Sequence, residues 1–376
     1  MTERIDRFLA EIQPATPCLV VDLEVVKQRY LELKELLPLA RIFYAVKANP
    51  APEVLRLLVG LGASFDAASR GEIELCLEAG APPERISFGN TIKKERDIAW
   101  AYAQGVRLFA FDSDAELDKL ARSAPGAQVF CRVLAECAGA EWPLSRKFGC
   151  APNMAAALML RARDSGLDAC GLSFHVGSQQ TDLGAWDKAL KLVAGLFRRL
   201  AGDGLELRLV NLGGGFPANY AREVPPLGAY ADAVMQAMTR HFGNRLPEMV
   251  IEPGRGLIGD AGVIQAEVVL IARKDHADRK RWVYLDIGRF GGLAETEGEA
   301  IRYRMRTRYN GAPTGPVVLA GPTCDSADVL YENAPCMLPL DLQVGDKVEI
   351  LAAGAYTSTY ASVGFNGFAP LKTYCI

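Results

Sequence analysis

Short runs of β-branched and aromatic residues recur along the first two thirds of the chain, and segments with apolar residues at helical spacing lie between them. The first four runs begin about 22 residues apart, which matches the length of one strand, one helix and two loops. Eight such units favour a closed (β/α)₈ barrel over a doubly wound sheet. The predicted strands span residues 41–46, 64–67, 86–88, 108–111, 128–133, 172–176, 207–212 and 249–252.

The pattern changes after about Gly262. Further strand-like runs follow one another there without long helical segments between them, at 266–272, 282–287, 317–320 and 347–351. We therefore expect a barrel over residues 19–262 and a mostly β C-terminal domain over 263–376, which residues 1–18 join.

The composition narrows the functional class. The chain has 376 residues, of which 50% are hydrophobic, and its 42 basic and 45 acidic residues give a net charge of −3. A nucleic-acid partner is not expected, because proteins that bind duplexes carry a basic surplus. The nine cysteines form no CxxC pair and the three histidines form no HExxH motif, so we expect neither a disulfide framework nor a metal site. No secretion signal and no apolar run long enough to cross a bilayer is visible, and we expect a cytoplasmic protein that does not bind membranes.

Polar residues stand where the predicted barrel strands end, and the active site of such a barrel forms at these carboxyl ends. They are Lys47 and Asp66 at the first two strands, His175 at the sixth, Gly213, Gly214 and Gly215 at the seventh, and Glu252 and Arg255 at the eighth.

Each of these residues has a chemical and a structural interpretation. Lys47 is either a desolvated amine that forms a Schiff base or an ion-paired surface lysine. The glycine triplet either binds an anion through backbone N–H groups or forms a tight turn. Arg255 either binds the same anion or forms an ion pair with Glu252. Glu252, if it is not paired in this way, could hold a ring nitrogen protonated. His175 could be a core residue with its hydrogen bonds satisfied. Taken together, these groups favour an aldehyde cofactor that carries a phosphate, pyridoxal 5′-phosphate (PLP).

Seven segments, in order, resemble those of the fold-type III PLP-dependent decarboxylases of basic amino acids, and within that family the ornithine decarboxylases most of all. The segments are AVKANP, FDAASRGEIE, SFHVGSQ, GGGFP, EPGRG, GPTCDSAD and GAYTSTYASVGFNGF. The resemblance covers nearly the whole chain. It implies an alanine-racemase-like TIM barrel with a β domain, assembled as a homodimer with two shared active sites.

The resemblance implies a role for each matching residue. Lys47 would form the Schiff base with PLP, Asp66 would orient it, and His175 would stack on the ring. Glu252 would hold the pyridine nitrogen, where alanine racemases place an arginine, and a carboxylate there makes the ring a strong electron sink. Arg132 would lie near the phenolic oxygen. The phosphate and cofactor set would be completed by Ser178, Gly213, Gly214, Gly215, Gly254, Arg255 and Tyr356.

The GPTCDSAD segment would reach the partner's active site in a dimer. Cys324 would then protonate the substrate Cα after carbon dioxide leaves, and Asp325 would pair with the distal ammonium. From the residues alone, a buried cysteine and a turn-forming aspartate are the simpler interpretation. Tyr356, Phe365 and Asn366 would line the same pocket.

The implied activity is decarboxylation of L-ornithine to putrescine and carbon dioxide. Dual specificity for lysine and ornithine stays open, because the two substrates differ by one methylene. Diaminopimelate is disfavoured, since the motif reads CDS and a second substrate carboxylate would need further basic groups. An inactive binding protein that resembles the antizyme inhibitors is the alternative of another class. A further acid that grips the distal amine cannot be assigned among Glu295, Glu297 and Glu299.

Overall fold

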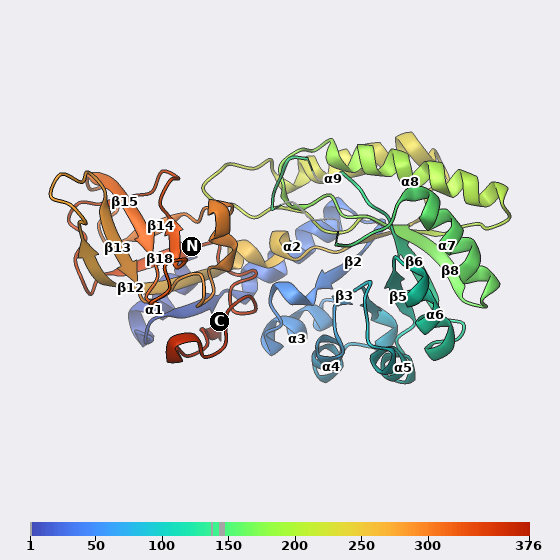
Figure 1. Ribbon diagram of the computed structural model, residues 1–376, viewed down its shortest axis with the longest axis horizontal. Helices are drawn as coiled ribbons and strands as arrows, with labels where there is room; N and C mark the ends of the chain where they lie inside the picture. The colour runs from blue at the N-terminus through green and yellow to red at the C-terminus, as the bar shows by residue number, and fades with distance from the viewer. Residues whose placement is uncertain (1, 137, 143–146) are drawn as a thin grey trace. The chain divides into compact units, whose positions relative to one another are not determined.

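The computed structural model describes residues 2–136, 138–142 and 147–376, and its contacts group the chain into two compact units (Figure 1). The barrel unit comprises Lys27–Pro217 and Val224–Leu257. The sheet unit comprises the chain up to Val26, Ala218–Glu223 and Ile258–Ile376.

Eight parallel strands close the barrel, as the repeat of strand-like runs predicted. Their order around the barrel follows the chain, and the last strand pairs with the first, Val250 lying opposite Arg41. The strands are β2 (Ala40–Ala45), β3 (Ser64–Ala67), β4 (Ile86–Phe88), β5 (Leu108–Phe111), β6 (Gln128–Arg132), β8 (Asp168–Ser173), β10 (Leu209–Asn211) and β11 (Glu248–Ile251).

Helices on the outside of the barrel alternate with its strands (Figure 1). They are α2 (Leu23–Leu36), α3 (Pro52–Gly60), α4 (Arg70–Glu78), α5 (Glu95–Ala103), α6 (Asp114–Ser123), α7 (Pro152–Asp164), α8 (Ala185–Gly202) and α9 (Leu227–Phe242). Side chains from several strands, including Phe43, Phe130 and Val250, form a buried cluster, so the barrel is a packed core.

Of the barrel strands, the sixth was predicted furthest from its observed bounds. The run at 172–176 marked it, but β8 begins at Asp168 and ends at Ser173, where it pairs with Arg132 of β6. The part that the prediction missed ends at Gly171, at which a Cβ atom would lie 2.2 Å from the Leu209 carbonyl oxygen of β10. Close approach of that neighbouring strand therefore requires a residue that weakens the sequence signal for a strand.

A nine-stranded sheet forms the second unit, which confirms the mostly β domain that four strand-like runs predicted. The strands are β1 (Cys18–Val21), β12 (Gly262–Ala272), β13 (Arg281–Leu285), β14 (Met305–Thr307), β15 (Thr314–Ala320), β16 (Val329–Tyr331), β17 (Met337–Pro339), β18 (Lys347–Leu351) and β19 (Lys372–Cys375). Because β1 pairs with β12 and β19, residues 18–26 belong to the sheet unit. The barrel unit therefore begins at Lys27 and ends at Leu257, whereas the sequence predicted a barrel over residues 19–262.

Helix α1 (Glu3–Ile12) packs Ile5 and Leu9 against Cys18, Val20 and Val263 of the sheet. A separate two-stranded sheet, which the sequence did not predict, pairs β7 (Ala140–Trp142) with β9 (Ser178–Gln180) in the barrel unit. None of the described helices combines the length and apolar character that crossing a membrane requires.

Candidate active site

Lys47 and Asp66 meet at the carboxyl ends of the first two barrel strands. Lys47 lies in the short 3₁₀ turn η1 (Val46–Ala48) directly after β2, and its Nζ lies 3.4 Å from Oδ2 of Asp66 in β3. The lysine side chain is 51% exposed and the aspartate side chain only 6%. A Cβ atom on Gly89, just after β4, would lie 1.8 Å from Oδ1 of Asp66, so this glycine leaves room for the carboxylate. The amine is therefore oriented by a buried acid while it stays accessible.

Glu252 follows the last barrel strand and carries an unusual carboxyl group. Burial and the charge of Asp66 raise its pKa to about 7, against a hydrogen bond from Asn211 and the charges of Lys47 and Arg132. The Asn211 Nδ2 donates to Glu252 Oε1 at 2.5 Å, while Asn211 Oδ1 accepts from the Gly213 N–H at 2.9 Å. Because the backbone donor fixes the amide's orientation, Asn211 presents an N–H to the carboxylate and favours its ionised form.

The glycine triplet forms a turn against the neighbouring strand ends. A Cβ atom would lie 2.3 Å from the Phe174 carbonyl oxygen at Gly213, and 2.6 Å from that of Glu252 at Gly214. At Gly215, whose φ of +104° also favours glycine, it would lie 2.7 Å from a backbone oxygen. Only glycine brings the backbone this close to β8 and β11, and such a turn suits an anion.

Arg255 and Ser178 lie beside this turn. Arg255 begins the short helix α10 (Arg255–Ile258), is 3% exposed, and donates from Nε and Nη2 to the Ser178 Oγ at 3.3 and 3.1 Å. Ser178 begins β9, in which the Gln180 N–H donates to the Gly215 carbonyl at 2.9 Å. Gly254 is buried next to the arginine. A guanidinium and a hydroxyl thus lie together near the glycine turn, as phosphate binding requires.

His175 is neutral at pH 7. Burial and the positive charges of Arg132 and Lys47 hold its pKa well below its usual value of 6.5. The Gly177 N–H donates to Nδ1 at 3.0 Å, so the neutral ring carries its proton on Nε2. Arg132 ends β6, and its guanidinium lies 5.3 Å from the centre of the Phe148 ring.

The remaining predicted site residues belong to the sheet unit. The Cys324 backbone N–H donates to Asn366 Oδ1 at 3.1 Å, and the exposed thiol lies 3.5 Å from the same oxygen. Asp325 Oδ1 accepts from the Ala327 N–H at 2.8 Å. Phe365 packs against Phe290 and lines a cavity of about 400 Å³. Tyr356 has the left-handed φ of +56°.

The three acids considered for the distal amine have different environments. The Glu299 carboxylate accepts from three successive backbone N–H groups, those of residues 332, 333 and 334, at 2.7, 2.7 and 2.5 Å. It therefore anchors that turn. Glu295 is buried and Glu297 is exposed. A role for any of them at the substrate stays a prediction.

Sequence reasoning missed Asn211, Gly89 and Asp328, which hold the predicted residues in place. Asn211 carried a signal, since a polar amide stands in an otherwise apolar strand two residues before the glycine triplet. Gly89 carried none, because it makes room for an aspartate of another strand. Asp328 ends the GPTCDSAD segment, but its contact with Arg289 joins parts of the chain 39 residues apart and has no local pattern.

The barrel residues fit PLP. Lys47 offers an accessible amine to the aldehyde, the glycine turn with Ser178 and Arg255 offers donors to the phosphate, and Glu252 offers an acid to the ring nitrogen. The neutral imidazole of His175 suits a position against the ring face.

Comparisons with known proteins agree with this fit. A sequence model described as pyridoxal-dependent decarboxylase, pyridoxal binding domain, matches residues 23–259. The lysine/ornithine decarboxylase of Selenomonas ruminantium is 36% identical over 370 residues, which cover 98% of this chain and 91% of that protein. Antizyme inhibitor 2 of Xenopus laevis is 30% identical, covering 98% and 82%.

Among solved structures, lysine/ornithine decarboxylase from Vibrio vulnificus complexed with cadaverine has a TM-score of 0.89 and 33% identity. The match covers 100% of this chain and 99% of that chain. Both the sequence and the fold thus lead to one conclusion: the chain belongs to the fold-type III pyridoxal-dependent decarboxylase family, and its cofactor is PLP.

Proposed function

We propose that this protein decarboxylates L-ornithine to putrescine and carbon dioxide, with lysine as a second substrate. The observation that carries the proposal is the placement of Lys47 beside Asp66, with Glu252 at the end of the neighbouring strand β11, in a chain of the decarboxylase family. The substrate class is supported by relatives named for lysine and ornithine.

In this proposal the accessible Nζ of Lys47 would hold the cofactor, at the position that the substrate amine would take over. Bound PLP supplies an electron sink for the pair released when carbon dioxide leaves. Glu252 keeps a proton at the ring nitrogen, and the hydrogen bond from Asn211 favours the ionised form of Glu252. Arg255 and Ser178 hold the phosphate.

Two residues of the sheet unit complete the proposed reaction. Cys324 delivers a proton to the substrate Cα, and Asp325 pairs with the distal ammonium, with one carboxylate oxygen held by the Ala327 N–H. We propose a homodimer in which these residues of one protomer serve the barrel site of its partner.

A cytoplasmic location belongs to the same proposal. The eight cysteines within the described ranges are free thiols, as a reducing compartment favours, and the ninth, Cys137, lies outside those ranges.

An end-point assay for carbon dioxide and amine over ornithine, lysine, arginine and diaminopimelate tests the function. We expect ornithine and lysine each to yield one carbon dioxide per diamine. Because one methylene separates these two substrates, the rates for ornithine and lysine should differ by about 10- to 200-fold at most. Lys47→Ala serves as the inactive control. If diaminopimelate were the only one of the four amino acids to release carbon dioxide, the proposed substrate would be wrong.

The similarity to an antizyme inhibitor keeps one other function in view, that of a binding protein without activity. The grouping of Lys47, Asp66 and Glu252 favours the enzyme, because a binding protein has no need of an accessible amine beside a buried acid. Protein that releases no carbon dioxide from any of the four amino acids would favour the binding protein instead.

A further inference from the structure

The loop that carries Cys324 and Asp325 connects β15 to β16, an antiparallel pair of the sheet unit. At its end stands Asp328, which is only 2% exposed. The Gly321 N–H donates to the Asp328 carbonyl at 2.8 Å, and the Asp328 N–H donates to the Asp325 carbonyl at 3.1 Å. The backbone of Asp328 thus closes the loop at two points.

The side chain of Asp328 binds the same loop from its buried side. Oδ2 accepts from the Thr323 N–H at 3.1 Å and from the Thr323 hydroxyl at 2.7 Å. Oδ1 accepts from the Arg289 N–H at 2.8 Å, in the segment that follows β13. One buried carboxylate therefore joins the residue before Cys324 to a neighbouring segment of the sheet unit.

Two glycines leave space for this carboxylate. A Cβ atom on Gly288 would lie 2.0 Å from Oδ1 of Asp328, and one on Gly321 would lie 2.3 Å from Oδ2. Neither glycine has a left-handed backbone in this structure, so the carboxylate explains their small size better than turn geometry does.

We propose that Asp328 is a positioning residue that fixes the backbone on both sides of Cys324, so that the thiol is presented to the reacting carbon. This inference rests on the proposed role of Cys324. Asp328 holds Thr323 through its side chain and Asp325 through its backbone N–H. Asn366 then accepts from the Cys324 N–H and lies next to the thiol.

The variant Asp328→Asn tests this, because it keeps the size of the side chain but replaces one acceptor oxygen by a donor group that opposes an N–H. Asp346→Asn is the matched control. Asp346 is also buried in the sheet unit, accepts from the Gln343 N–H at 2.8 Å and pairs with Arg308, but lies outside the loop.

The first measurement is the rate at which iodoacetamide alkylates Cys324 in the holoenzyme, read by peptide mass spectrometry. A loosened loop frees the thiol from Asn366, so we expect a rate about fivefold higher in Asp328→Asn and unchanged within about twofold in Asp346→Asn.

The second measurement is the ratio of products from ornithine. A proton delivered to the substrate Cα gives the diamine. A proton delivered instead to the former aldehyde carbon leaves the electron pair on the cofactor, and hydrolysis by one water then gives an aminoaldehyde and pyridoxamine 5′-phosphate without an external oxidant. We expect the aminoaldehyde fraction to rise about tenfold in Asp328→Asn and at least as much in Cys324→Ala. A purely structural residue would lower the yield of folded protein and leave this ratio unchanged.

The role of Asp328 alone would be overturned if Cys324→Ala raises the aminoaldehyde fraction while folded Asp328→Asn behaves like wild type in both measurements. An unchanged product ratio in Cys324→Ala would overturn the role of Cys324 and the inference that rests on it. If Asp328→Asn does not fold, Thr323→Val removes only the hydroxyl donor, and a smaller shift in the same direction is expected. Its absence would contradict the inference.

Discussion

At the residue scale, the environment of Glu252 determines how its proton is shared. The folded protein raises the pKa of this carboxyl from 4.5 to about 7, chiefly through burial. Between these values the folded state holds a proton that the unfolded chain has released, so the group's contribution to stability falls as pH rises through this window.

Glu252→Gln removes this titration in the apoprotein. We therefore expect the stability of the variant relative to wild type to increase between about pH 5 and about pH 7.5, as urea denaturation would measure it. Glu248→Gln, at an exposed position of the same strand, is the control. A constant difference for Glu252→Gln would refute the buried, proton-sharing carboxyl.

His175 gives the opposite case at the same scale. Its pKa is lowered, so the folded protein loses stability as pH falls below about 6.5, where the unfolded imidazole takes up a proton.

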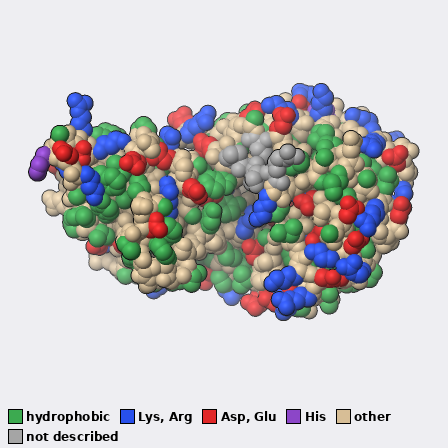
Figure 2. Space-filling view, viewed as in Figure 1, with side chains coloured by type: hydrophobic (Ala, Val, Ile, Leu, Met, Phe, Trp, Pro, Cys, Tyr) green, Lys and Arg blue, Asp and Glu red, His purple; other side chains and the backbone are tan. Residues whose placement is uncertain are grey.

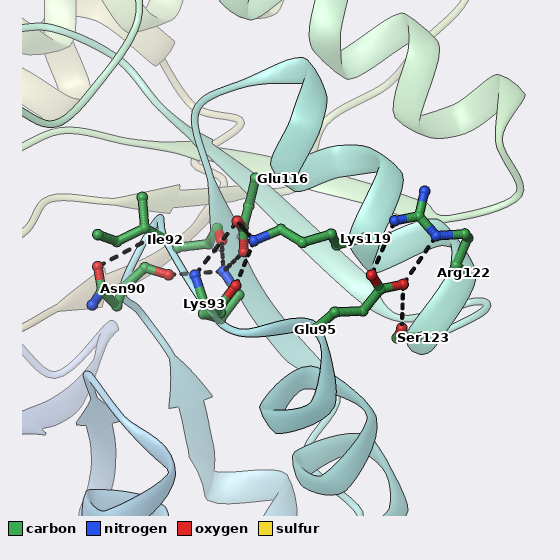
Figure 3. Close-up of polar contacts among 9 residues, drawn as sticks. Asn90, Ile92, Lys93, Glu95, Glu116, Lys119, Arg122 and Ser123 are labelled. Atoms are coloured by element: carbon green, nitrogen blue, oxygen red, sulfur yellow. Dashed lines mark hydrogen bonds and ion pairs between the residues drawn. The ribbon is translucent and has the colours of Figure 1, made fainter.

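At the element scale, a buried lysine ties the loop after β4 to β5 and α6 (Figure 3). The Lys93 Nζ donates to the carbonyls of Asn90 and Ala110 at 2.8 and 2.6 Å and lies 3.0 Å from Glu116 Oε1. Lys119 contacts the other oxygen of Glu116 at 2.5 Å. Burial lowers the pKa of Lys93 to about 8, so the Glu116 carboxylate is what keeps it charged at pH 7.

Lys93→Met leaves the Asn90 and Ala110 carbonyls without their donor and Glu116 with only one cation. We expect a loss of about 3–5 kcal/mol in the free energy of unfolding, as for a broken buried pair. The exposed pair of Arg122 with Glu95, also drawn in Figure 3, is the matched control, and Arg122→Ala should cost no more than about 1 kcal/mol. Equal losses in urea denaturation would show that burial of Lys93 does not matter.

The elements also show what the sequence could predict. The barrel strands were predictable because each is a short apolar run followed by a helical segment, and Lys47 and Glu252 were found because barrel chemistry lies at strand ends. Asn211 and Glu252 are 41 residues apart, and their hydrogen bond depends on the pairing of β10 with β11. Asp328 fits against Gly288 only once the sheet has formed. Contacts of this kind are set by three-dimensional packing and leave no local pattern.

At the scale of the whole molecule, the surface agrees with the small net charge. On the face that Figure 2 shows, basic and acidic side chains are interspersed over the barrel unit. On this face the basic side chains form no continuous stripe of the kind that duplex-binding proteins carry.

Subunit mixing tests the proposed shared sites. A Lys47→Ala protomer has lost its barrel site and a Cys324→Ala protomer has lost its thiol, so a heterodimer regains one intact site if each site uses both protomers. We expect about half of the wild-type activity per dimer in purified heterodimers, and sedimentation should give the mass of two chains. Heterodimers with no more activity than either parent would argue that each site lies within one protomer.

Borohydride reduction of the purified protein, followed by peptide mass mapping, tests whether PLP is bound covalently to Lys47 at the end of β2. We expect a phosphopyridoxyl label on the peptide that contains Lys47 and its absence from the Lys47→Ala variant. A label on another lysine, or none on wild-type protein incubated with PLP, would contradict the role of Lys47.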